Sequence, residues 1–427
     1  MRKLSFILLA LLATVTANAG LTLDECQRKA RANYPEIVQY DLIAQSGQYN
    51  LESAARGWIP QITLSGQVTW QSAVASFPEQ LTQMLEAQGV SMPGIAQDQY
   101  KVALDVQQTI WDGGVSKANR QLAKSEAEEQ RLSNDVSMYS LEKRINDIFF
   151  GILLLDENYE TALSRKELFE SNLHKLESLR RNGSALQSDL DLVRVELLSL
   201  QQQMDQNRSS RANFAAMLSI FIGEDAQSQT LEKPSLQVIA PLSGAMRPEI
   251  RLLDAKIATL DARSELLGAS LTPKFSFFAQ GYYGNPGLDM FKSMTSRDWT
   301  WNAYLGVRAQ WNISALFTFG TDRKKIDNAR QLLETQKKTF TFNNDLQLTQ
   351  QNSEIARMQK ALQGDDEIVQ LRSNVRRTAE SQRENGIIDT STLIQRIMEE
   401  SAAINARSIH EIELLKTIYE LKHTQGK

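Results

Sequence analysis

The chain has 427 residues, of which 42% are hydrophobic, and a formal net charge of −4. This acidic balance argues against a nucleic-acid-binding protein, which would carry a basic face, so no nucleic-acid partner is expected. A single cysteine, Cys26, excludes an internal disulfide and a thiolate metal cage. The three histidines, His174, His410 and His423, lie far apart in charged sequence and are expected on the surface.

Residues 1–19 have the pattern of a secretory signal peptide. Arg2 and Lys3 precede an apolar run from Leu4 to Val15, and Ala17-Asn18-Ala19 provides a small-x-small cleavage site. The run is shorter than the ~20 residues that a membrane-spanning helix needs. We therefore expect the mature chain to begin at Gly20, outside the cytoplasm.

The first part of the mature chain predicts a helix followed by two amphipathic strands. Residues 22–57 have helical composition, with a kink or break at Pro35. Residues 61–70 and 102–111 alternate between apolar and polar side chains, as a strand with one apolar face does. Residues 71–99 contain two prolines and two glycines among polar residues and are expected to form a long loop.

A very long helix follows the second strand. From Gly114 to Arg181 there is no proline, and apolar residues recur at heptad-like steps of three and four. A helix of this length would measure about 100 Å. Asn182-Gly183-Ser184 interrupts it, and a second heptad-like segment then returns antiparallel before ending near Gly223.

The same plan occurs twice in the sequence. Pro35-Glu36-Ile37 recurs as Pro248-Glu249-Ile250, and strands are predicted at residues 274–283 and 299–313. Another long helix then breaks at Asn385-Gly386. We interpret residues 20–223 as a first structural repeat with a tip turn near residue 183. Residues 224–246 would be a connector, and residues 247–427 a second repeat with a tip turn near residue 386.

All six tryptophans lie in or beside the four predicted strands: Trp58, Trp70, Trp111, Trp299, Trp301 and Trp311. Aromatic residues at strand ends, combined with apolar strand faces, are typical of the girdles of membrane barrels. Four strands cannot close a membrane barrel, because the smallest closed barrels have about eight. Several chains must therefore pool their strands, and three copies would give twelve.

The duplicated order of these motifs resembles the TolC family of outer-membrane efflux proteins. The resemblance rests on the repeated Pro-Glu-Ile entries, on the QTIWDGG corner at 108–114 with a weaker copy ending at Phe319-Gly320, and on the two Asn-Gly turns. It covers essentially the whole mature chain. It implies a membrane α+β fold: a homotrimeric 12-stranded outer-membrane β-barrel, with four strands per chain, continued by a long periplasmic α-helical coiled-coil barrel.

The resemblance also implies function and partners. Family members are passive exit ducts of tripartite efflux or type I secretion systems, located in outer-membrane lipid with a large periplasmic part. They contact a periplasmic adaptor, which joins them to an energised inner-membrane transporter. The adaptor would dock on the two turns, here Gly183, Ser184, Ala185, Leu186, Gly386, Ile387 and Ile388. An ordinary helix–helix loop is the alternative interpretation of these turns.

Residues just beyond the turns correspond to the narrow periplasmic entrance of the family. Ser188 and Asp189 match a Ser/Thr-Asp pair that helps to hold the entrance closed. Where some relatives carry two aspartates after the second turn, this chain has Thr392 and Gln395, with Asp389 nearby. This departure argues against an acidic, cation-sensitive gate, and a solvated helix face is the alternative role for Asp189.

No nucleophile–base pair, phosphate-binding loop or metal-ligand cluster is evident in the sequence. We therefore expect no enzymatic activity, no catalytic or metal site and no cofactor. The competing hypothesis is a periplasmic coiled-coil scaffold or efflux adaptor without a membrane barrel. Duplicated amphipathic strand pairs with tryptophan ends argue against it.

Overall fold

The structure is a computed structural model that describes residues 20–91, 94–235 and 247–426. The predicted signal peptide at 1–19 and part of the predicted connector, 236–246, lie outside the described residues. The chain divides into two compact units, and each combines segments from both halves of the sequence. One unit is helical and is built mainly from Arg131–Leu252 and Gln336–Lys427. The other contains the strands and is formed by Leu42–Gln130 and Leu253–Thr335.

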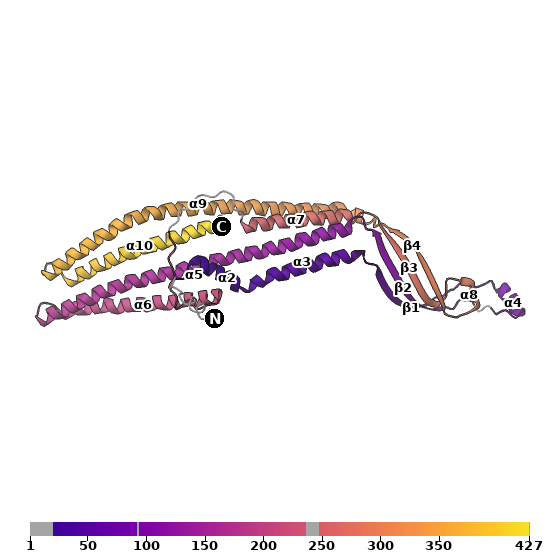
Figure 1. Cartoon of the computed structure of the whole chain (residues 1–427), viewed down its shortest axis with the longest axis horizontal. Coiled ribbons are helices and arrows are strands. Elements are labelled where there is room, and N and C mark those ends of the chain that lie inside the picture. The colour runs from indigo at the N-terminus through magenta and orange to yellow at the C-terminus, as the bar shows by residue number, and fades with distance from the viewer. Residues whose placement is uncertain (1–19, 92–93, 236–246, 427) are drawn as a thin grey trace, which may run out of the picture. The chain divides into compact units, whose positions relative to one another are not determined.

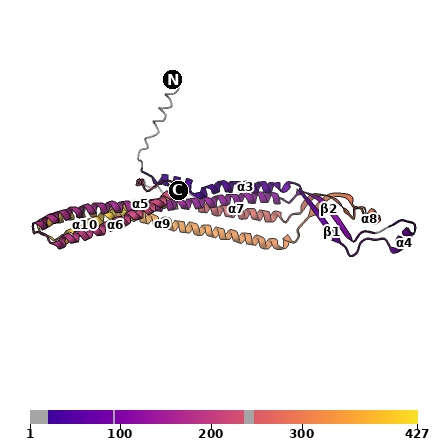
Figure 2. The same cartoon turned by 90° about the horizontal axis from the view of Figure 1, so that it is seen from below.

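The helical unit consists of two long helical hairpins and a short N-terminal helix. The hairpins pair α5 (Val115–Arg181) with α6 (Gln187–Ile222) and α9 (Ala315–Glu384) with α10 (Thr390–Thr424), as Figures 1 and 2 show. Helix α2 (Leu23–Asn33) begins where the Thr22 side chain accepts a hydrogen bond from the Glu25 amide at 3.3 Å. None of the helices in the described residues is both long and apolar enough to cross a bilayer.

The predicted break at Pro35 is confirmed. The residues after α2 form a 3-10 turn, η1 (Pro35–Val38), and the chain continues as α3 (Gln39–Ala55) and a second turn, η2 (Arg56–Trp58). A proline cannot donate the backbone hydrogen bond that an uninterrupted helix needs at this point. The proline thus separates α2 from α3.

Two apolar cores hold the helical unit together. The larger core centres on α5, where Phe149, Phe150 and Ile145 are almost fully buried, and it takes in Cys26 of α2. Burying each such side chain contributes about 1.5–3 kcal/mol. The second core lies toward the hairpin tips and joins all four hairpin helices, through Leu176, Val193, Ala379 and Ile397 among others.

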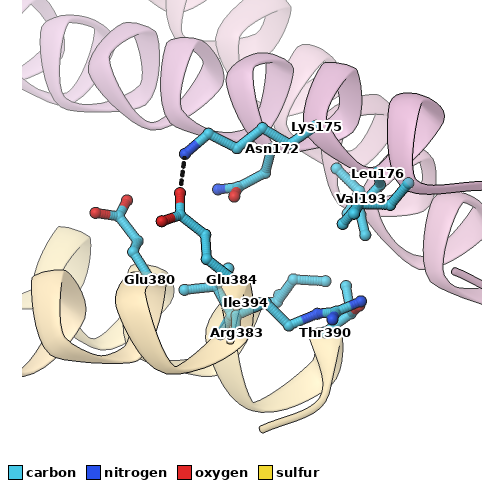
Figure 3. A pocket seen from close by; sticks show the side chains of 11 residues that line it. Asn172, Lys175, Leu176, Val193, Glu380, Arg383, Glu384, Thr390 and Ile394 are labelled. Carbon is cyan, nitrogen blue, oxygen red and sulfur yellow. Dashed lines mark hydrogen bonds and ion pairs between the residues drawn. The ribbon is translucent and has the colours of Figure 1, made fainter. Parts of the chain in front are cut away.

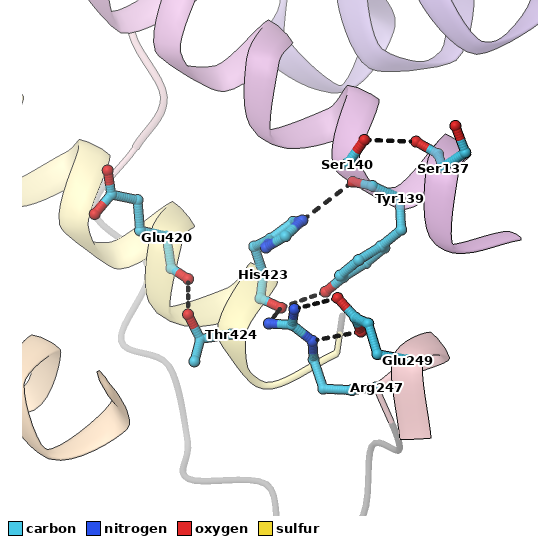
Figure 4. A network of polar contacts seen from close by, with 8 residues as sticks. All are labelled: Ser137, Tyr139, Ser140, Arg247, Glu249, Glu420, His423 and Thr424. Carbon is cyan, nitrogen blue, oxygen red and sulfur yellow. Dashed lines mark hydrogen bonds and ion pairs between the residues drawn. The ribbon is translucent and has the colours of Figure 1, made fainter. Parts of the chain in front are cut away.

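A polar cluster attaches the end of α10 to α5 (Figure 4). The His423 ring stacks on Tyr139 with 4.0 Å between centroids, and His423 Nε2 donates to the Tyr139 carbonyl oxygen at 3.1 Å. Arg247 donates to Glu249 at 2.9 Å through Nε, and its guanidinium lies 5.4 Å from the Tyr139 ring centre. The expectation of surface histidines is therefore wrong for His423, which is half-buried because α5 covers it.

The strand-containing unit has one antiparallel four-stranded sheet in the order β1-β2-β3-β4. Its strands are β1 (Gln61–Trp70), β2 (Asp98–Trp111), β3 (Lys274–Asn285) and β4 (Thr300–Gln310), and they follow the predicted strand positions closely. Helix α7 (Pro248–Ala269) leads into β3. Within the described chain, β1 and β4 each pair on one side only, so the sheet has two open edges.

The register aligns the apolar side chains of the four strands on one face. Ile62 pairs with Val106, Val106 with Ala279, and Ala279 with Leu305, so that one row crosses the whole sheet. Leu64 and Leu305 are each 73% exposed. The opposite face is largely polar. Hydrophobic side chains this exposed need a cover that a single chain does not provide.

The segment predicted as a 71–99 loop is more ordered than expected. It contains helix α4 (Glu79–Ala87), and β2 begins at Asp98 because Asp98 pairs with Trp70. A second short helix, α8 (Met290–Thr295), lies in the connection between β3 and β4. The Gly94 amide donates to the Met294 carbonyl oxygen at 3.0 Å, which joins the two connections.

The turn from β2 into α5 is a tight corner. Asp112 accepts hydrogen bonds from the amides of Gly114 at 3.0 Å and Ser116 at 2.7 Å, and so caps α5. Gly113 has a φ of +70°, and a Cβ there would overlap the Thr272 side chain. The corner therefore requires glycine, and it fixes where α5 begins relative to the sheet.

Candidate functional site

The candidate site is formed by the ends of the two helical hairpins, which we call the tip turns: residues 182–186 and 385–389. Both turns end their first helix in the same way. Gly183 and Gly386 have φ values of +75° and +70°. The amide after each glycine donates to a carbonyl five residues back, Ser184 to Leu179 and Ile387 to Gln382, each at 2.8 Å. These are Schellman caps, which require a left-handed residue that glycine adopts without strain.

Each tip turn presents one apolar side chain to solvent and packs another inward. Leu186 is 69% exposed and Ile387 is 70% exposed. Ala185 and Ile388, each two residues after its glycine, pack against the apolar core near the tips. The structure thus divides the predicted docking residues into an exposed pair and an anchoring pair, with Ser184 exposed beside them.

The predicted acidic entrance residues begin the return helices. Asp189 accepts a hydrogen bond from the Leu186 amide at 3.0 Å, at the start of α6. Asp389 is the N-cap of α10 and accepts from the Thr392 amide at 2.8 Å. Hydrogen bonds from Thr392 and then Ser391 lower the pKa of Asp389, so this carboxylate is ionised at neutral pH.

The other predicted entrance residues are more dispersed. Ser188 and Gln395 are exposed, and Thr392 is half-buried in the first turn of α10. Gln395 donates to Glu399 at 3.1 Å, one turn further along the same helix. Of the predicted entrance residues, Asp189 lies close to the second hairpin, 4.0 Å from Arg383. Ser188 and Gln395 take no part in this contact.

Ion pairs connect the two hairpins at the tips. Figure 3 shows the pair between Lys175 of α5 and Glu384 of α9, which are 3.0 Å apart. Arg383 of α9 lies 4.0 Å from Asp189 of α6. Arg383 also donates to Thr390 Oγ1 at 3.2 Å. Between these pairs is a cavity of about 40 Å³, whose apolar wall includes Leu176, Val193, Leu393 and Ile394.

Arg383, Lys175 and Glu384 were not predictable as site residues from the sequence. Each is an ordinary charged residue on a long charged helix, and its partner lies about two hundred positions away in the chain. The only feature of the sequence that could have pointed to them is position, because Arg383 and Glu384 directly precede the second Asn-Gly turn. Charge alone does not distinguish them from their solvated neighbours.

A buried ion pair in the second hairpin, further from the tip turn, was also not predictable from the sequence. Arg376 of α9 donates to Glu400 of α10 and, at 2.7 Å, to Glu380. Glu400 is only 5% exposed. Burial opposes the charge on Arg376, but the bonds to Glu400 and Glu380 outweigh it, and the pKa of Arg376 is raised. The pair of Arg376 with Glu400 thus joins α9 to α10 at a distance from the tip turn.

The six tryptophans lie at the two ends of the sheet. Trp58, Trp111 and Trp311 are at the end where the helices begin, and Trp311 Nε1 donates to the Leu271 carbonyl oxygen at 2.8 Å. The remaining three are at the opposite end: Trp70, Trp299 and Trp301. Trp299 and Trp301 contact Tyr283 with ring centres 5.2 and 5.0 Å apart. All six are at least 40% exposed.

Comparisons with known proteins agree with this architecture. Residues 27–224 match the family model described as outer membrane efflux protein. The structure is similar to that of the outer membrane protein VceC from Vibrio cholerae, with 14% identity, a TM-score of 0.72, and coverage of 95% of this chain and 96% of that one. The search of curated protein sequences finds no match.

Two further solved structures have the same fold. The CmeC outer membrane channel of Campylobacter jejuni is 13% identical, with a TM-score of 0.71 and coverage of 95% of this chain and 85% of that one. The MtrE outer membrane channel of Neisseria gonorrhoeae, solved in its open state, is 11% identical. Its TM-score is 0.66, and the match covers 95% of this chain and 88% of MtrE.

Proposed function

Because the chain belongs to the family of outer membrane efflux proteins, we propose that it is the exit duct of a tripartite export system. Three copies assemble, their sheets close a 12-stranded barrel in the outer membrane, and their helices extend the duct through the periplasm. The duct is passive. A periplasmic adaptor connects it to an inner-membrane transporter that supplies the energy.

The observation that carries this proposal is the open sheet with one apolar face. In a bilayer every unpaired backbone group costs several kcal/mol, so β1 and β4 cannot remain edges there. Pairing β4 of one copy with β1 of the next satisfies both edges, and the exposed row through Ile62 and Leu305 then faces lipid. The tryptophans at the two sheet ends suit the two membrane interfaces.

The order of elements supports the proposed domain organisation. Each half contains a helix, two strands, a long helix and a return helix, so residues 20–223 and 247–427 are structural repeats in this proposal. Residues 224–246 connect them, and residues 1–19 are the export signal that is removed.

The tip turns dock the adaptor in this proposal. Leu186 and Ile387 are the two most exposed apolar side chains of the tips, and rigid glycine caps hold them. The ion pairs of Arg383 with Asp189 and of Lys175 with Glu384 hold the hairpins together beside the entrance. Opening the entrance by separating the hairpins would have to break both pairs.

The first experiment is single-channel recording of the purified protein in a planar bilayer, with the oligomeric mass measured on the same sample. We expect a trimer that gives discrete conductance steps, which are small because the entrance is narrow. A soluble monomer or dimer without channels would refute the duct and favour the periplasmic scaffold.

A second experiment addresses docking. Leu186→Asp with Ile387→Asp should abolish export and adaptor binding, because two exposed apolar contacts are replaced by charges. Conductance and trimer mass should not change. Ser164→Asp with Gln359→Asp, on helices away from the tip turns, is the control. Normal export by the tip variant would disprove the docking assignment.

A further inference from the structure

The first turns of α5 carry an unusual set of charges. Lys117, Arg120 and Lys124 lie within its first ten residues, and the first acidic residue is Glu126. The positive end of the helix dipole lies at the N-terminus, where acidic residues stabilise and basic residues destabilise a helix. Lys117, which lies in the first turn, is therefore not placed there to stabilise α5, and no acidic residue offsets it in the two turns that follow.

The three cations have no acidic partner among the described residues. Each is exposed, and none forms an ion pair within the part of the chain that the structure describes. Two acids close to α5 in sequence are already engaged: Asp112 accepts hydrogen bonds from the amides of the corner, and Glu126 pairs with Arg263 at 3.1 Å. The charges of the three cations are thus not neutralised by ion pairs among the described residues.

A groove joins the three cations. It has a volume of about 610 Å³ and is lined by Lys117, Arg120 and Lys124 from α5 and by Glu265 and Ala269 from α7. The single carboxylate of Glu265 leaves the lining with a net charge of +2. The groove is large enough for a phosphate-bearing group and has the opposite charge.

The groove lies beside the end of the sheet where the helices begin. Trp111, 45% exposed, ends β2 only a few residues before α5. At 1.5 Å per residue, the three cations lie about 3, 8 and 14 Å along α5 from its start. The polar headgroup layer is roughly 5–8 Å deep on each side of a bilayer, and long basic side chains extend toward it.

The second long helix begins with the same bias. Arg323 and Lys324 of α9 are exposed and form no ion pair among the described residues, and Lys325 pairs with Asp322 at 3.0 Å. Two helices that follow different strands thus both place basic residues just beyond the sheet.

From these observations we propose that the groove of Lys117, Arg120 and Lys124 binds the phosphate headgroup of an anionic phospholipid in the periplasmic leaflet of the outer membrane. Clusters of basic residues next to a membrane attract anionic lipids. This proposal rests on the membrane orientation in the proposed function. The bound headgroup would fix the depth of the corner at which the barrel passes into the helices.

The test is native mass spectrometry of the full-length protein in detergent, titrated with phosphatidylglycerol or phosphatidylethanolamine. The test variant is Lys117→Gln, Arg120→Gln and Lys124→Gln combined. The control, Arg180→Gln, Lys360→Gln and Arg377→Gln, removes the same charge from exposed positions far from the sheet. We expect the wild type and the control to prefer phosphatidylglycerol, and the test variant to bind it at least about tenfold more weakly.

Three results would overturn the proposal: equal phosphatidylglycerol binding by the test variant, no preference over phosphatidylethanolamine in the wild type, or displacement of the lipid by millimolar inorganic phosphate. The last would show a site for the free anion. Trimer mass and conductance are measured on the same samples. A trimeric, conducting test variant with unchanged lipid binding would refute the lipid site alone, whereas absence of channels in the wild type would refute the duct.

Discussion

Glycine at the tip turns is a requirement of backbone geometry. Gly183 has a φ of +75° and no heavy atom within 4 Å of an added Cβ, so a side chain there would be strained without any clash. Gly364, in the middle of α9, also has open space around it but lies in regular helix. The two positions therefore separate the effect of backbone conformation from the effect of packing.

We predict opposite outcomes for alanine at these two positions. Gly183→Ala should destabilise the hairpin by about 1 kcal/mol, because alanine disfavours the left-handed region. Gly364→Ala should stabilise it by up to about 1 kcal/mol through helix propensity. Thermal unfolding followed by circular dichroism would measure both. Equal shifts in the same direction would contradict the cap geometry.

Burial also distinguishes ion pairs that look alike in sequence. Arg376→Ala would leave Glu400 buried without its partner, and we expect the unfolding free energy to fall by about 2–4 kcal/mol. Arg357→Ala breaks an exposed pair with Glu354 and should leave the unfolding free energy nearly unchanged. Chemical denaturation of both variants is the measurement, and similar losses would show that burial does not decide the effect.

At the scale of elements, the attachment of α10 to α5 depends on the protonation state of His423. Burial lowers the pKa of His423, and the nearby positive charge of Arg247 lowers it further. The hydrogen bond to the Tyr139 carbonyl oxygen acts in the opposite direction but is outweighed. In the unfolded chain a histidine titrates near ~6.5. As the pH falls below that value the unfolded state gains a proton before the folded state does, so stability is lost on acidification.

We therefore predict that the wild type loses more stability than His423→Gln when the pH is lowered from about 7.5 to about 5. Unfolding temperatures across this range would measure the difference. Other titrating groups affect both proteins equally, so their contribution cancels. A wild type and variant with parallel pH profiles would show that His423 does not contribute.

The elements that repeat a simple period were predictable from the sequence. The alternation of apolar and polar side chains predicted β1 at residues 61–70, and long stretches without proline predicted the two long helices. Helix α4 was missed because Pro78 before it and Gly89 after it suggested a loop, although Leu81, Met84 and Leu85 have helical spacing. In a short segment these two signals compete, and the proline and glycine mark the ends of the helix here and do not exclude it.

The candidate site was only partly predictable for a different reason. The turns at Gly183 and Gly386 could be predicted from the sequence, because a left-handed backbone conformation at the end of a helix strongly favours glycine. The pairing of Arg383 with Asp189 depends on how two hairpins pack, and no local pattern carries that information. Burial of Glu400 and His423 was hidden for the same reason.

At the scale of the whole molecule, the two faces of the sheet can be tested with adjacent residues. Leu64→Arg places a charge on the apolar face near the middle of β1, where it should cost about 2–4 kcal/mol in a bilayer. Thr63→Arg places the same charge on the polar face and should be tolerated. Heat-modifiable gel migration of both variants would measure barrel formation, and equal loss would reject the assigned lipid face.

The two open edges of the sheet also have a consequence for genetics. A chain whose β1 or β4 cannot pair would still pair with normal chains through its other edge strand. Every trimer that contains such a chain would then fail to close its barrel. If a cell made equal amounts of normal and edge-defective chains, only about one in eight trimers would be wholly normal. Edge mutations should therefore be dominant in a cell that also carries the intact gene, whereas mutations that prevent folding altogether should be recessive.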